Sequence, residues 1–160
     1  MDKVKTIKTE AEALLAKMIT TYEVEVEEGD ENMFHVIIKA EEEAPTVIGR
    51  HGETIRAIQK ILEVVLYKSL GASVSILVNV NDYREKQKER LEGIAAQLAE
   101  KAQALHQATY FRGLSSYERK MTHEFITATY PELTTYSIGE GRDRKLVIDM
   151  KGNEPQTEEV

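Results

Sequence analysis

Two glycines that flank an arginine and a histidine form the first group of residues with chemical potential: Gly49, Arg50, His51 and Gly52. Glycine lacks a Cβ atom, so a turn that contains two glycines lets the backbone approach a phosphate closely. Arg50 adds a permanent cation, and His51 can donate a hydrogen bond to a phosphate oxygen in either protonation state. The group predicts a phosphate-binding loop; the alternative is a tight turn in which the glycines only permit the bend.

Arg119 and His123 form the second group. On a helix, residues at this spacing lie one turn apart on the same face. A guanidinium group with five donors and an imidazole ring with at least one can hold a phosphate at two points. The alternative is a structural pair, in which Arg119 bonds to Glu118 or another acid and His123 caps a buried carbonyl. The candidate binding residues close to this pair in the sequence, or following it, are Lys120, Arg142, Arg144 and Lys145.

No group of residues in the sequence has the spacing of a catalytic or metal site. The chain has 4 histidines without a common ligand spacing and 0 cysteines, and the motifs GxSxG, HExxH and GxxxxGK[ST] do not occur. The acidic residues within 23–31 and 41–43 lack the pattern of a calcium-binding loop. We therefore expect a protein that is not an enzyme and that uses no metal ion or cofactor.

The net charge of the chain, −7, disfavours binding of a polyanion such as a nucleic acid. This charge is, however, unevenly distributed along the sequence. Residues 1–43 carry 5 Lys and Arg against 12 Asp and Glu, whereas residues 44–151 carry 16 against 13. Coulomb attraction to phosphate is screened beyond about 10 Å at moderate salt, so local clusters matter more than the total. The pattern is compatible with salt-sensitive binding of a nucleic acid. With 7 Tyr, 3 Phe and no Trp, we expect backbone contacts to outweigh base stacking.

The glycine pair lies in a segment whose hydrophobic periodicity predicts six elements in the order αββααβ. These are a helix over residues 4–18, strands over 22–26 and 34–38, a one-turn helix over 44–48, a long helix from Gly52 to about 70, and a strand over 74–80. The two glycines therefore join the one-turn helix to the long one.

In the second half of the chain, the same periodicity predicts a long helix, a short strand, a helix that carries the Arg119 and His123 pair, and two further strands. Asn81 and Asp82 can cap the long helix, and Ser115 and Glu118 have the spacing of a capping box. The expected strands cover residues 108–111, 134–138 and 145–150, with a polar loop at 139–144.

These elements predict an α+β protein with two small domains, residues 1–82 and residues 83–151, followed by an acidic, disordered tail at residues 152–160. No segment has the roughly 20 apolar residues that cross a bilayer, and no signal peptide is evident. Together with the lack of cysteine, this favours a cytoplasmic protein without membrane insertion.

The first domain resembles the type II KH domain, whose GxxG loop holds a nucleic-acid backbone while bases lie in an apolar groove. The resemblance implies that Gly49, Arg50, His51 and Gly52 clamp the backbone. It also makes Ile48 and Ile55 candidate walls of the groove. Residues 116–123, followed by residues 135–141 and the basic residues after them, resemble the R-three-H domain, which is named for its Arg-x-x-x-His pair.

In this order the two domains resemble the bacterial Jag family, also called the KhpB or SpoIIIJ-associated family, over residues 1–151. Long members carry an additional N-terminal module, so we expect a short form without it. The resemblance implies binding of single-stranded RNA in the cytoplasm, with roles in cell elongation, envelope control or sporulation. Single-stranded DNA remains open as the ligand. A protein-interaction scaffold that partners a small KH-domain protein or forms a homodimer also remains open.

Overall fold

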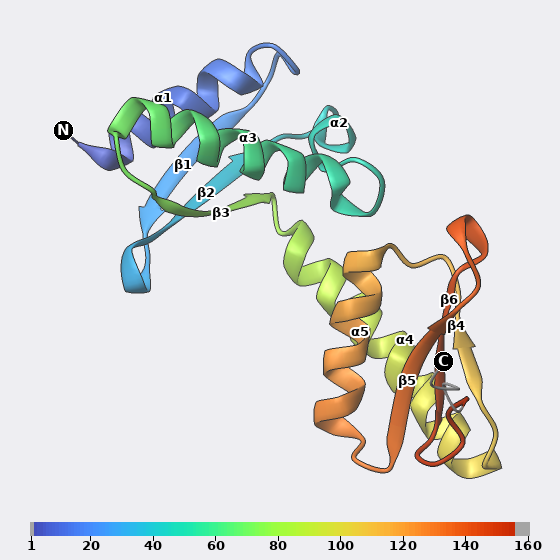
Figure 1. Cartoon of the computed structure of the whole chain (residues 1–160). Helices are drawn as coiled ribbons and strands as arrows, with labels where there is room; N and C mark the ends of the chain where they lie inside the picture. The colour runs from blue at the N-terminus through green and yellow to red at the C-terminus, as the bar shows by residue number, and fades with distance from the viewer. Residues whose placement is uncertain (1, 156–160) are drawn as a thin grey trace. The chain divides into compact units, whose positions relative to one another are not determined.

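The structure of the protein, a computed structural model, describes residues 2–155 (Figure 1). They form two compact units, the first ending at Glu85 and the second beginning at Lys86. None of the described helices is long and apolar enough to cross a membrane. Of the predicted disordered tail, residues 156–160 lie outside the described residues. In the described part of this tail, the Gly152 N–H donates to the carboxylate of Glu154.

The first unit contains the predicted αββααβ order, which confirms the fold class expected from the sequence. Its elements are α1 (Lys3–Leu15), β1 (Glu23–Glu28), β2 (Met33–Lys39), α2 (Ala44–Ile48), α3 (Glu53–Leu70) and β3 (Ser75–Val80). The main difference is that α1 ends at Leu15, earlier than its apolar pattern suggested.

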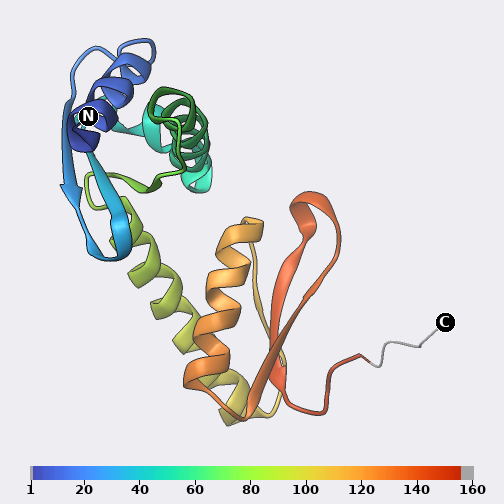
Figure 2. The same ribbon diagram turned by 60° about the vertical axis from the view of Figure 1, so that its left-hand side comes forward.

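The sheet of the first unit has the order β1-β2-β3, with β1 antiparallel and β3 parallel to β2. Side chains alternate between its faces, so Val36, Ile38 and Val78 point into the core while the glutamates of β1 point to solvent. Helices α1 and α3 cover the apolar face (Figure 2). The one-turn helix α2 and the start of α3 are thereby held at one end of a closed core.

Two polar contacts between distant residues hold the segment that leads into α2. The carboxylate of Glu43 accepts hydrogen bonds from the backbone N–H groups of Thr20 and Thr21, the shortest at 2.8 Å. These donors, the Thr21 N–H above all, hold the pKa of Glu43 below its usual value. Asn81 was predicted to cap the following helix, but its side chain instead pairs with the backbone N–H and C=O of Ala40, at 3.1 and 2.9 Å.

The remaining elements are α4 (Tyr83–Leu105), β4 (Thr109–Phe111), α5 (Ser116–Thr129), β5 (Leu133–Ile138) and β6 (Lys145–Met150). The first residues of α4 belong to the first unit, and the rest of the helix belongs to the second. The second sheet has the order β4-β6-β5 and is antiparallel throughout. This agrees with the predicted helix-strand-helix-strand-strand order.

The second core lies between this sheet and the helices α4 and α5 (Figures 1 and 2). Leu146 and Ile148 of β6 pack against these helices. By strand alternation, Val147 points to the opposite face, where it is flanked by its cross-strand partners Tyr110 and Tyr136. No described helix covers that face.

Candidate nucleic-acid interface

The GxxG segment is a tight turn with a positive φ at three of its four positions. Gly49 has φ 71° and ψ 176°, and Gly52 has φ 73° and ψ 17°. His51 also has a positive φ, 55°. The turn places Arg50 and His51 between the end of α2 and the first residue of α3, as the sequence predicted.

Both glycines lack room for a side chain. A Cβ atom at Gly49 would lie 2.1 Å from the Thr54 hydroxyl oxygen, and one at Gly52 would lie 2.8 Å from the ring of Tyr83. Tyr83 is the first residue of α4 and packs against the first core. The glycines are thus needed for the turn itself, which was the structural alternative for this motif, and this need does not conflict with phosphate binding.

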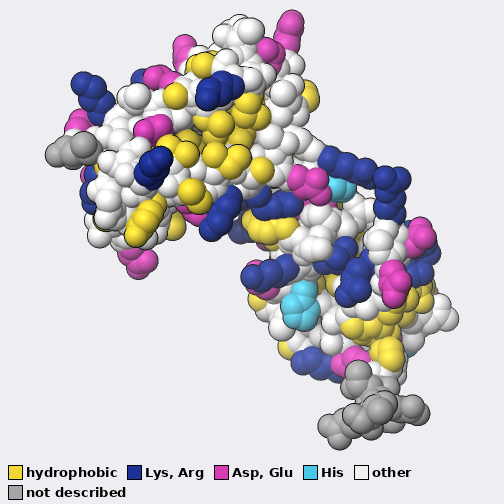
Figure 3. Space-filling model, turned by 45° about the horizontal axis from the view of Figure 1, so that its top comes forward, with side chains coloured by type: hydrophobic (Ala, Val, Ile, Leu, Met, Phe, Trp, Pro, Cys, Tyr) yellow, Lys and Arg dark blue, Asp and Glu magenta, His cyan; other side chains and the backbone are white. Residues whose placement is uncertain are grey.

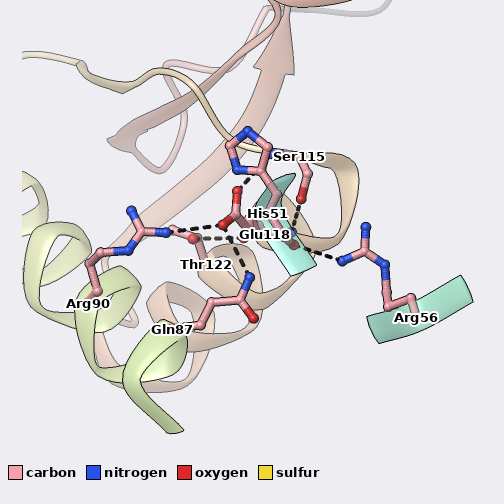
Figure 4. A network of polar contacts seen from close by, with 7 residues as sticks. All are labelled: His51, Arg56, Gln87, Arg90, Ser115, Glu118 and Thr122. Atoms are coloured by element: carbon pink, nitrogen blue, oxygen red, sulfur yellow. Dashed lines mark hydrogen bonds and ion pairs between the residues drawn. The ribbon is translucent and has the colours of Figure 1, made fainter. Parts of the chain in front are cut away.

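The turn has more positive groups around it than the Arg50 and His51 of the motif alone. Arg50 is exposed, and its side chain has no ion pair within the part of the chain that the structure describes. Arg56, in the first turns of α3, donates a hydrogen bond of 3.1 Å to the His51 carbonyl (Figure 4). No side chain caps the N-terminus of α3 at Gly52, so the positive end of this helix faces the turn. No sequence signal singled out Arg56 beyond its position shortly after the motif.

The two candidate groove walls differ in exposure. Ile48 is partly buried and packs against the first core from the end of α2. Ile55 is only 1% exposed and belongs to the core itself. This burial does not support the expectation that Ile55 lines a groove for bases, because no surface remains for a base to contact. Ile48 stays a candidate.

The start of α5 is organised by one buried carboxylate. Glu118 is 0% exposed, and with Ser115 it forms the predicted capping box, in which each side chain bonds to the other's backbone N–H. Its carboxylate also accepts hydrogen bonds from Gln87 at 3.2 Å and Arg90 at 3.1 Å, both from α4 (Figure 4). The sequence indicated the cap, but the contacts with α4 depend on tertiary packing.

Arg119 and His123 are both held in place by neighbouring groups. The Arg119 guanidinium donates to the Leu114 carbonyl at 2.9 Å and to the Ser116 hydroxyl at 3.0 Å. The Nδ1 atom of His123 forms a hydrogen bond with the hydroxyl of Thr135 on β5. The pair therefore lies where α5 meets an edge strand of the sheet. The Arg119 guanidinium keeps N–H donors beyond those that these contacts occupy, and the contact with Thr135 leaves the Nε2 atom of His123 available.

The other predicted cations divide into two groups. Lys120 is exposed and 4.0 Å from Glu124, while Arg142 and Arg144 are exposed in the loop between β5 and β6. The start of α5 and this loop lie at the same end of the second unit (Figures 1 and 2). Lys145 alternates with the core residue Leu146 and so points to the face of the sheet that lacks helices. The structure thus separates Lys145 from the Arg119 and His123 pair.

Comparison with known proteins follows the same division into two units. Residues 5–78 match the family of KhpA/KhpB KH domains, and residues 89–149 match the R-three-H domain family. The protein from Bacillus subtilis (strain 168) named RNA-binding protein KhpB is 30% identical over 147 residues, which cover 91% of this chain and 67% of that protein. The chain belongs to the KhpB family.

Other relatives are longer than the chain. RNA-binding protein KhpB of Streptococcus pneumoniae is 28% identical over 145 residues, 89% of this chain and 44% of the relative. Its counterpart in Lactiplantibacillus plantarum is 29% identical over 105 residues, 66% of this chain and 32% of the relative. The chain therefore spans between about a third and two thirds of the length of these relatives. The matches confirm the predicted pairing of a KH domain with an R-three-H domain.

The backbone of the GxxG turn leads to a prediction about stability. Gly49→Ala should lower the free energy of unfolding of the first unit by about 2–3 kcal/mol, because its dihedral angles disfavour a side chain and Thr54 blocks the added methyl group. Gly71→Ala is the matched control, since Gly71 has the same φ of 71° but open space around it, and it should cost only about 1 kcal/mol. Urea denaturation monitored by circular dichroism measures both. Equal losses would contradict the steric argument.

A second prediction concerns the buried carboxylate of α5. Glu118→Ala should destabilise the second unit by about 2–4 kcal/mol, because it removes the cap and the buried carboxylate that accepts hydrogen bonds from Gln87 and Arg90. Glu124→Ala, on the same helix but exposed, should change stability by less than about 0.5 kcal/mol. Thermal and urea unfolding of both variants provide the comparison, and similar effects would show that the network contributes little.

Proposed function

We propose that this protein binds single-stranded RNA without catalysing a reaction, through a KH domain at residues 1–82 and an R-three-H domain at residues 83–151. The observation that carries the proposal is the GxxG turn, where an exposed arginine stands beside the N-terminus of α3. The names of the relatives support it, since each is named RNA-binding protein KhpB. No group of acidic and histidine side chains in residues 2–155 is arranged to hold a metal ion.

The proposed mechanism is a clamp on the sugar-phosphate backbone. Phosphate oxygens accept hydrogen bonds from Arg50 and His51 and from N–H groups near the start of α3, while Gly49 and Gly52, which have no Cβ atom, let the backbone come close to the phosphate. This use of a helix N-terminus and a glycine turn follows the general chemistry of anion binding. Ile48, which is partly buried at the end of α2, would contact a base at the edge of the turn.

The second contact is proposed at the R-three-H domain. Arg119, Lys120 and His123 on α5, with Arg142 and Arg144 on the neighbouring loop, would hold further phosphates. The start of α5, which carries Arg119 and Lys120, lies at the same end of the unit as this loop, and this supports the grouping. Two weak sites in one chain raise the affinity for a strand that reaches both, because the second contact becomes intramolecular.

The cellular role is proposed from the family. We place the protein in the cytoplasm as a post-transcriptional regulator of the Jag type, linked to cell elongation, envelope control or sporulation. Single-stranded DNA is the nearest competing ligand, because the proposed contacts address phosphates and do not read the 2′-hydroxyl.

A protein-interaction scaffold is the second candidate function. The outer face of α3 exposes Ile61, Val64 and Tyr67, at 48%, 61% and 60%, beside a hollow of about 570 Å³ along β3. Hydrophobic side chains gather over the helices of the first unit in Figure 3. Such a surface suits a second KH domain, either from a small KH protein or from another copy of the chain. A scaffold predicts no dependence of its activity on Arg50 or Arg119.

The first binding prediction tests the GxxG turn. The double substitution Arg50→Asp and His51→Asp should raise the Kd for a fluorescent oligouridylate about 10- to 100-fold, since it replaces charge-assisted hydrogen bonds with repulsion. Fluorescence anisotropy over a salt series gives the affinity, and the wild type should show a log-log slope of about −3 to −4 if four to six phosphates are held. An oligodeoxyuridylate competitor separates RNA from DNA.

The matched control replaces two exposed lysines of the first unit, Lys8 and Lys17, with aspartate. This control changes the net charge by at least as much as the Arg50 and His51 substitutions do. It should alter the Kd by less than about threefold, because both lysines lie away from the turn. Unchanged binding by the Arg50 and His51 variant would reject the KH site, and a salt slope near zero would reject the phosphate clamp.

The second binding prediction tests the Arg119 and His123 pair. Replacing both residues with alanine should shorten the segment of oligouridylate protected from nuclease and reduce the salt slope by about one unit. Lys8→Ala with Lys17→Ala removes two exposed cations that belong to neither proposed site and should leave the protected length unchanged. A footprint that stays unchanged in the first variant would mean that the two domains do not engage one strand.

A further inference from the structure

The edge strand β4 borders a basic hollow that none of the proposed contacts uses. The hollow has a volume of about 350 Å³ and is lined by residues of β4, of the C-terminal part of α4 and of the segments next to them. Its walls include Leu98, Leu105 and Tyr110, and the volume falls within the range of roughly 300–1,000 Å³ typical of small-ligand sites. Tyr110 is 45% exposed, so its ring is available to a ligand.

The charged groups around this hollow are all cations. Lys101 and Arg112 line it, and no aspartate or glutamate does. Both side chains are exposed, and neither has an ion pair among residues 2–155. A third cation, Lys145 from β6, has its Nζ atom 4.7 Å from the centre of the Tyr110 ring. Lys145 is not one of the walls, but it covers one face of the Tyr110 ring, so a base would stack on the other face.

An aromatic ring among unpaired cations fits one ligand class well. A nucleobase of a single strand stacks on a tyrosine, and the phosphates on either side of it need positive charge. An acidic peptide would satisfy the cations but would leave the ring and the leucines without a planar partner. The exposed backbone edge of β4 could pair with an extended peptide, but β4 has only three residues, which offers few hydrogen bonds.

We propose that Tyr110, Lys101 and Arg112 form a nucleotide-binding subsite, in which the base stacks on Tyr110 and the flanking phosphates contact the two cations. Lys145 supports the ring and adds to the positive field. The inference rests on the proposed function, because it assigns part of the single strand to a new surface. It also gives a role to Tyr110 and Arg112, which lie in the segment before the Arg119 helix.

The subsite is distinct from the Arg119 and His123 pair. The sheet order β4-β6-β5 places Tyr110 on one edge strand, whereas His123 contacts Thr135 on the other. With neighbouring strands about 4.8 Å apart, the two edges lie about 10 Å from each other. A single-stranded RNA that binds at both places must cross the second unit. Substitutions at one site therefore leave the side chains of the other site unchanged.

The test measures binding of a fluorescent oligouridylate to the full chain. Tyr110→Ala should raise the Kd about 5- to 100-fold, whereas Tyr110→Phe, which keeps the stacking ring, should stay within about twofold of the wild type. Lys101→Gln with Arg112→Gln should reduce the salt slope by about one unit, and Lys8→Gln with Lys17→Gln should not. Circular dichroism and thermal melting establish that each variant is folded.

Ultraviolet crosslinking to an oligouridylate that carries bromouracil bases locates the contact directly. Crosslinked peptides that contain Tyr110 in the wild type would support the subsite. If the wild type binds, Tyr110→Ala binds equally well and the crosslinks map elsewhere, the inference is overturned while the proposed function stands. In that case the cations would protect the exposed edge of β4 from pairing with another strand, or the hollow would bind a protein. If the wild type does not bind the oligonucleotide at all, the proposed function fails first.

Discussion

The backbone conformation at Gly49 is the constraint on which the first site depends. Its φ of 71° combined with a ψ of 176° is accessible to glycine and strained for other residues, and Thr54 fills the space where a Cβ would stand. Because the chain can turn there, α2 ends and α3 begins within a few residues. Arg50 then stands beside the uncapped start of an 18-residue helix. The electrostatic character of the site follows from a steric requirement.

The second unit reaches a similar result through a buried charge. Glu118 caps α5 and also binds Gln87 and Arg90 of α4, so one carboxylate sets both the start of the helix and its contact with its neighbour. Arg119 follows directly and is oriented by the Leu114 carbonyl and the Ser116 hydroxyl. In both units, therefore, the candidate arginine lies at the start of a helix: Arg50 beside α3 and Arg119 in α5.

Most of the architecture and part of the site could be predicted from local patterns. The αββααβ order, the capping box of Ser115 and Glu118, and the helix that carries Arg119 and His123 all follow from periodicity and short-range signals. The exceptions share a cause. Asn81 was a plausible cap but pairs with Ala40, which lies 41 residues earlier. Ile55 was expected from the resemblance to line a groove, but it is 1% exposed. The partner of Asn81 and the surface left around Ile55 both depend on tertiary packing.

The sequence by itself determined which residue types stand at each helix start and how they are spaced, because a helix turn and a strand pleat repeat over only a few residues. Only the tertiary structure decided which cations share a surface. It turned Lys145 toward Tyr110 and away from Arg119, placed Tyr83 against Gly52, and opened a basic hollow beside β4. These outcomes depend on how α4 and the sheets pack, which brings together residues far apart in the chain.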